Sequence, residues 1–171
     1  MTTSSELLLD SFDRIRQVVH RAVDGLPADD LAWRPDPEAN SIAWLVWHLT
    51  RIQDDHVAAV AAHEQVWTAG GWASRFGLPF DDREIGYGQD SEAVAAVRVE
   101  SGELLTAYHD AVYQQTIEYV RTIKDDDLDR VVDRKWNPPV TLGVRLVSVI
   151  SDDLQHAGQA GYLRGMIQRR G

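Results

Sequence analysis

The 171-residue chain contains no cysteine. Without thiols the protein cannot form a disulfide framework, a cysteine-based zinc site or a cysteine nucleophile. Any metal must therefore be bound by His, Asp or Glu side chains. Any sulfur chemistry must use a thiol that a substrate brings.

Long apolar runs and clustered basic residues are also missing. No stretch approaches the ~18 consecutive apolar residues of a membrane span, and the N-terminus MTTSSELLLDSFDR lacks the basic region of a secretory signal. A cytoplasmic location without membrane binding is therefore expected. Acidic residues outnumber basic ones by 27 to 17, and the basic residues are scattered apart from the short tail 164–170. Because nucleic-acid binding needs clustered Lys and Arg, that function is not expected.

The residues that are present have an ordinary globular composition, with 44% apolar and 26% charged side chains. The length fits one domain over residues 1–171. Apolar side chains recur at steps of three and four, which predicts four helices over about 5–24, 41–64, 91–123 and 141–168. Ser41 or Asn40 and Thr141 are suitable N-caps. The predicted fold class is all-α, a four-helix bundle with long irregular connections, and these connections allow a topology other than simple up-down-up-down.

Two long connections separate these predicted helices. Segment 67–90 contains five glycines and is expected to be irregular, and such a loop is uncommon in a compact domain unless it is functional or packed. Gly102 marks a candidate break in the third helix. The β-branched piece 130–136, RVVDRKW, is a candidate short strand before the last helix.

Polar residues interrupt the apolar faces of two predicted helices. His48 stands in the stripe between Leu45 and Ile52, and Asp152 precedes His156 by four residues. Side chains four apart project from consecutive turns of one helix face. Asp152 and His156 can therefore chelate one metal ion, and His48 of a facing helix would supply a third ligand.

Three protein ligands leave a coordination position open, as in catalytic zinc sites. A buried Asp152 needs a cation or several donors, and either a metal ion or a protonated histidine supplies the cation. Each part of this pattern also has an interpretation without a metal ion. His48 can be an ordinary hydrogen-bonded core residue, and Asp152 with His156 can form an ion pair on the helix surface.

The segments WLVWHLTRIQDDH and DDLQHAGQAGYLRG resemble the DinB-like superfamily. This superfamily includes metal-dependent thiol transferases such as mycothiol-dependent maleylpyruvate isomerase and the bacillithiol transferases. The strongest match is His156-Ala157-Gly158-Gln159, similar to the family's His-x-Gly-Gln, and the block from Trp44 to His48 is the second. In many members the position of Asp152 is histidine, and in isomerase-like members it is glutamate.

The resemblance implies a four-helix bundle, often a homodimer, with a metal triad at His48, Asp152 and His156. The implied cofactor is a divalent metal ion, Zn²⁺ first and Ni²⁺ second. The implied activity is transfer of a low-molecular-weight thiol of the mycothiol type to a small electrophilic substrate. Two alternatives remain: a metal-dependent hydrolase that activates water, and a non-enzymatic, stress-related binding protein with a structural or vestigial metal.

Other polar residues near the predicted triad receive weaker interpretations. Asp55 lies on the stripe of His48 and either orients a ligand or is solvated, the latter being favoured. His56 is rotated by about 80° from His48 around the helix and is not expected to be a ligand. Arg51 and Arg145 are candidates for binding an acidic substrate, but a surface position is favoured for both. Gln159 is a candidate hydrogen-bond partner near the metal, or a packing residue.

Overall fold

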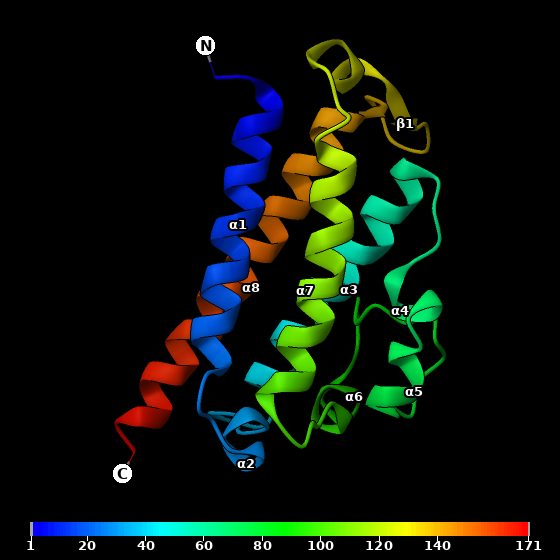
Figure 1. The fold of residues 1–171 in the computed structure, drawn as a ribbon. Coiled ribbons are helices and arrows are strands. Elements are labelled where there is room, and N and C mark those ends of the chain that lie inside the picture. The colour runs from blue at the N-terminus through cyan, green and yellow to red at the C-terminus, as the bar shows by residue number, and fades with distance from the viewer. Residues whose placement is uncertain (1, 171) are drawn as a thin grey trace.

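A computed structural model describes residues 2–170 and contains four long helices (Figure 1). These are α1 (Ser4–Val23), α3 (Ile42–Ala61), α7 (Gly102–Val120) and α8 (Leu142–Gln168). Both α1 and α3 pack against α7 and α8, so α1 and α3 lie diagonally across the bundle. α1 and α8 run in one direction, and α3 and α7 run in the other (Figure 1). The predicted all-α bundle is confirmed, and its topology is not simple up-down-up-down.

Side chains fix the starts of the two helices that carry the predicted triad. The Ser41 side chain accepts a hydrogen bond from the backbone N–H of Trp44, and Thr141 accepts one from Val144. These caps satisfy N–H groups that have no partner within the helix. None of the helices within residues 2–170 combines the length and hydrophobicity that a membrane crossing requires.

The third predicted helix is broken, so the expectation of one helix from 91 to 123 is wrong. The chain forms α6 (Ser91–Ala96), passes through an extended stretch and restarts at Gly102 as α7. A Cβ at Gly102 would lie 3.0 Å from the Val23 carbonyl oxygen. Glycine therefore allows the start of α7 to approach the end of α1, which accounts for the predicted break at this residue.

The connections contain short elements. Three are one-turn helices, namely α2 (Ala28–Leu31), α4 (Val66–Ala69) and α5 (Trp72–Phe76), and a 3-10 helix, η1 (Asp125–Asp129), follows α7. Strands β1 (Val131–Asp133) and β2 (Val140–Thr141) form an antiparallel hairpin in which Val131 pairs with Thr141. The predicted short strand is confirmed, and its hairpin lies where α3 ends and α8 begins (Figure 1).

A buried ion pair holds the long connection after α3 against the bundle. The side chains of Arg51 and Asp54 are 0% and 1% exposed and lie 3.6 Å apart. Arg51 donates to the carbonyl oxygens of Glu84 and Asp82, while Asp54 accepts two backbone N–H groups at the start of α4, each at 2.8 Å. The favoured surface position for Arg51 is therefore wrong, because the connection covers the face of α3 that the bundle leaves open.

His109 is a fully buried polar residue on α7. The Thr50 hydroxyl donates to the Val46 carbonyl, so its oxygen accepts the Nδ1–H of His109 at 3.2 Å. The other ring nitrogen has no hydrogen-bond partner among residues 2–170. Burial lowers the pKa of His109 to about 3, so the ring is neutral at neutral pH.

We expect His109 to weaken the fold in acid. Its folded-state pKa lies below the ordinary 6.5, so the unfolded chain takes up the proton first as the pH falls. The stability is therefore complete above pH 6.5 and is lost toward pH 3, by about 1.4 kcal/mol per pH unit. His109→Leu should flatten the decline of the unfolding free energy between pH 6 and 4 in urea titrations. An unchanged slope in this variant would contradict the assignment.

Candidate metal centre

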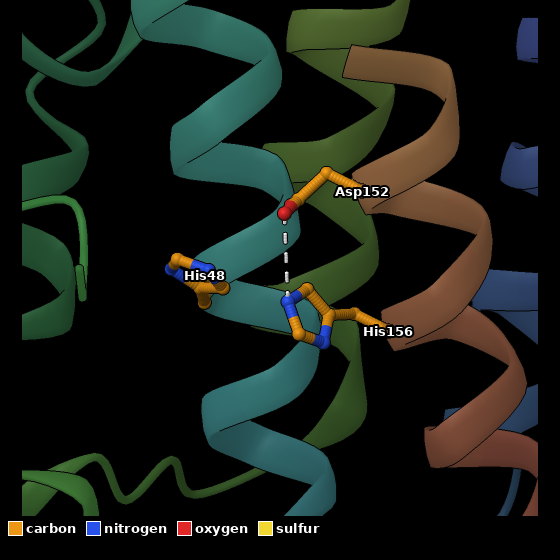
Figure 2. Close-up of side chains that lie close together, drawn as sticks. All are labelled: His48, Asp152 and His156. Carbon is orange, nitrogen blue, oxygen red and sulfur yellow. Dashed lines mark ion pairs between the residues drawn. The ribbon is translucent and has the colours of Figure 1, made fainter. Parts of the chain in front are cut away.

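The three side chains singled out in the sequence meet between α3 and α8 (Figure 2). His48 projects from α3, and Asp152 and His156 project from consecutive turns of α8. One potential ligand atom of each residue lies within 4.8 Å of the others. Asp152 Oδ1 is 3.7 Å from His156 Nε2. The antiparallel packing of two helices thus brings together residues that lie about a hundred positions apart in the sequence.

The backbone of the long connection orients His48. Its Nδ1 lies 2.5 Å from the carbonyl oxygen of Ile85, and only an Nδ1–H can make this bond because a carbonyl oxygen accepts. Nε2 therefore keeps its lone pair. The Trp44 ring stacks on the imidazole with centroids 4.5 Å apart, which limits the ring to this plane.

A side chain of its own helix orients His156. Its Nδ1 lies 3.0 Å from Oε1 of Gln159 and donates to this amide oxygen. The lone pair of Nε2 therefore remains available to a metal ion, and this nitrogen lies on the side of Asp152. Metal-binding histidines commonly donate their second ring N–H in this way, which fixes the tautomer. The predicted hydrogen-bonding role of Gln159 is confirmed.

The charge and burial of the triad suit a divalent cation. Burial lowers the pKa of His48, and His156 lowers it further, while the bond to Ile85 and the charge of Asp152 raise it. Asp152 Oδ2 is buried and has no hydrogen-bond partner within residues 2–170. The ion pair with His156 leaves this oxygen unsatisfied. Two imidazole nitrogens and a carboxylate oxygen are a common ligand set for Zn²⁺ and Ni²⁺.

The triad opens toward the surface on the α8 side. The side chains of His156 and Asp152 are 19% and 35% exposed, whereas His48 is buried. An ion held by three residues here would keep a face available to a small molecule, which is the arrangement of catalytic zinc.

The remaining candidates lie outside the triad. Asp55 accepts a hydrogen bond from Gln65 and faces the connection, so it does not orient a ligand. Arg145 is only 19% exposed and binds Asp133 at 3.1 Å, so it is not a free surface residue.

Sequence reasoning missed Ile85 and Gly86. Every residue has a backbone carbonyl, so the residue type does not show which carbonyl accepts a hydrogen bond from a side chain. The only available signal was a glycine two residues before another one, within the long connection.

Gly86 is the residue whose replacement should disturb this centre most selectively. Its φ is +90°, and a Cβ would lie 2.6 Å from Nδ1 of His48. Gly88 has a similar φ of +73° but open space around a Cβ. Alanine costs about 1 kcal/mol of backbone strain at either position, and only Gly86→Ala displaces His48. We expect Gly86→Ala to weaken Zn²⁺ binding roughly tenfold or more in competition titrations, and Gly88→Ala to bind like the wild type. Equal affinities in the two variants would contradict this role.

Comparisons with known proteins identify the family and the fold. The family model for mycothiol-S-transferases matches residues 7–169, whereas no curated protein matches the chain. Among solved structures, the crystal structure of a conserved protein of locus from Enterococcus faecalis is 31% identical, with a TM-score of 0.89 and 96% of each chain covered. The chain therefore belongs to the mycothiol-S-transferase family, which is a DinB-like family.

Proposed function

We propose that this protein is a metal-dependent thiol S-transferase that joins a mycothiol-type thiol to a small electrophile. His48, Asp152 and His156 would hold the metal ion. The observation that carries the proposal is the pair of imidazoles whose Nδ1 atoms are already engaged, which leaves the lone pairs of both Nε2 atoms available beside the half-buried carboxylate of Asp152. Membership in the family supports the thiol as co-substrate.

The donor set suits Zn²⁺, and Ni²⁺ is the alternative. The order of affinities for divalent ions does not by itself select zinc. Asp152 is shorter than the histidine or glutamate that relatives carry, so it offers a hard oxygen ligand close to the axis of α8. We propose Zn²⁺ as the physiological ion.

In the proposed reaction both bonding partners come from the substrates. The chain has no cysteine, so the new sulfur–carbon bond forms between the incoming thiol and the electrophilic carbon. When bound, the divalent ion would lower the pKa of the thiol and favour its thiolate. The Ile85 carbonyl and Gln159 keep the two imidazoles in place. Trp44, whose Nε1 donates to Gln89 at 2.8 Å, shields one face of His48 from water.

Elemental analysis of tag-free protein tests the metal centre. We expect about one zinc or nickel ion per chain in the wild type and loss of the ion in His156→Ala. His63→Ala is the matched control, because His63 is a second half-buried histidine that takes no part in the triad. Full metal content in His156→Ala, or none in wild type after incubation with Zn²⁺ and Ni²⁺, would overturn the assignment of the triad.

Thiol consumption tests the activity. Metal-loaded protein should accelerate the reaction of mycothiol with an alkylating electrophile, and Asp152→Asn should lower the rate roughly tenfold to hundredfold. A panel of other low-molecular-weight thiols defines the co-substrate. If no thiol reacts faster with the protein than without it, while esters or amides are cleaved, the centre activates water and the transferase assignment is wrong.

A further inference from the structure

A polar cavity lies at the end of α3 and α8 where the hairpin packs. Its volume is about 420 Å³, and we call it the hairpin pocket. α3 supplies His56 and Val60, α8 supplies Arg145, and the hairpin segment supplies Arg130, Asp133 and Lys135. The hairpin thus forms one wall of a space whose opposite walls are the two helices that carry the triad.

The hairpin pocket is cationic in an otherwise acidic protein. Three basic residues and one carboxylate line it, although the chain carries a formal net charge of −10. Asp133 is already saturated, since one oxygen accepts the backbone N–H of Lys135 and the other accepts Arg145. Arg130 donates to two uncharged oxygens, the Val60 carbonyl and a tyrosine hydroxyl. The positive charge therefore exceeds what the lining residues neutralise.

Arg145 is the best-placed cation of the pocket. Its guanidinium carries five N–H donors, of which the hydrogen bond to Asp133 uses one. The side chain is 19% exposed, and its remaining donors are not among the buried groups without a partner, so a ligand can reach them. Asp133 holds the guanidinium in a fixed orientation, which lowers the entropy that a ligand would lose on binding.

The pocket and the metal centre lie between the same two helices, the pocket closer to the hairpin. α3 and α8 are antiparallel (Figure 1). A residue two turns after His48 on α3 therefore lies at about the same height along the helix pair as a residue two turns before Asp152 on α8. Those positions are His56 and Arg145, about 10 Å from the triad at 1.5 Å per residue. Burial lowers the pKa of His56 most, Arg145 lowers it further, and Asp55 and Asp152 raise it. The imidazole thus lies within range of charges on both sites.

We propose that the hairpin pocket binds a carboxylate of the substrate whose reacting atom lies at the metal centre. The planar guanidinium of Arg145 matches a carboxylate in shape and charge. This inference rests on the proposed function. It implies that the substrate carries an acidic group about 10 Å from its reacting atom.

Two synthetic electrophiles test the proposal. 6-(2-Chloroacetamido)hexanoic acid places a carboxylate about 9 Å from its reactive carbon when extended, and its primary amide is the neutral match. In either case the thiol sulfur bonds to the CH₂ carbon, the carbon–chlorine bond breaks, chloride leaves with the electron pair, and the thiol proton passes to the buffer. Only the group that reaches the pocket differs.

We expect wild-type protein to prefer the acid over the amide by roughly tenfold to hundredfold in kcat/KM, as for a charge-assisted hydrogen bond. In Arg145→Gln the ratio should fall at least several-fold, because Arg145 is the best-placed cation of the pocket. Arg14→Gln is the control, because it removes an exposed arginine paired with Asp10 on α1, and it should keep the wild-type ratio. An equal rate for both electrophiles in wild type, or a wild-type ratio in Arg145→Gln, would overturn the proposal.

Binding of an unreactive probe separates this proposal from the proposed activity. 6-Acetamidohexanoate should shift the backbone amide NMR signals of residues 130–135 and Arg145, and 6-acetamidohexanamide should not. Lys135→Gln is a second variant in case Arg145→Gln fails to fold. The Lys135 side chain is exposed, so this variant should fold, and it should weaken binding of the acid. Binding without any thiol transfer would support the pocket and reject the transferase. Absence of binding at millimolar acid would reject the pocket alone.

Discussion

The buried pair of Arg51 and Asp54 is the interaction on which the candidate metal centre depends. Taking two charges out of water is costly unless hydrogen bonds replace the lost hydration. Here the carbonyl oxygens of residues 82 and 84 and the backbone N–H groups of α4 replace it. An irregular connection is thereby fixed against α3, one residue before the carbonyl that orients His48. Breaking the pair would release the Ile85 carbonyl and Gly86 together, although neither charged residue contacts the triad.

The triad itself uses two different ways of orienting a histidine. His156 is oriented within its own helix, because Gln159 lies three residues further along and reaches the ring from the next turn. His48 depends on a segment 37 residues away in sequence. The first arrangement depends on α8 and on the Gln159 amide. The second fails when the long connection moves, so His48 is the ligand most sensitive to distant substitutions.

Periodicity was sufficient to predict the long helices and two of their caps, although not the break before α7, because these features depend on neighbours within one or two turns. Spacing alone left the triad undecided, and the resemblance to a family was needed to single out His48, Asp152 and His156 together. Asp153, which precedes His156 by three residues, was not considered from the sequence. The structure places it on the buried side of α8, where burial raises its carboxyl pKa well above the ordinary value. Arg51 was misplaced because its burial comes from a connection without a periodic pattern. The Ile85 carbonyl is a backbone group, so the identity of its residue carries no information about the contact.

Small residues on α8 account for how a side chain as short as aspartate can serve in this position. Ala157 and Ala160 are fully buried on the core side of the helix, and the distance between packed helices depends on the side chains at their contact. Alanines let neighbouring helices approach closely, which brings the backbone of α8 toward the bundle and reduces the reach that a ligand needs. A metal ion shared by Asp152 and the two imidazoles would depend on this packing, because the short aspartate side chain leaves little reach to spare.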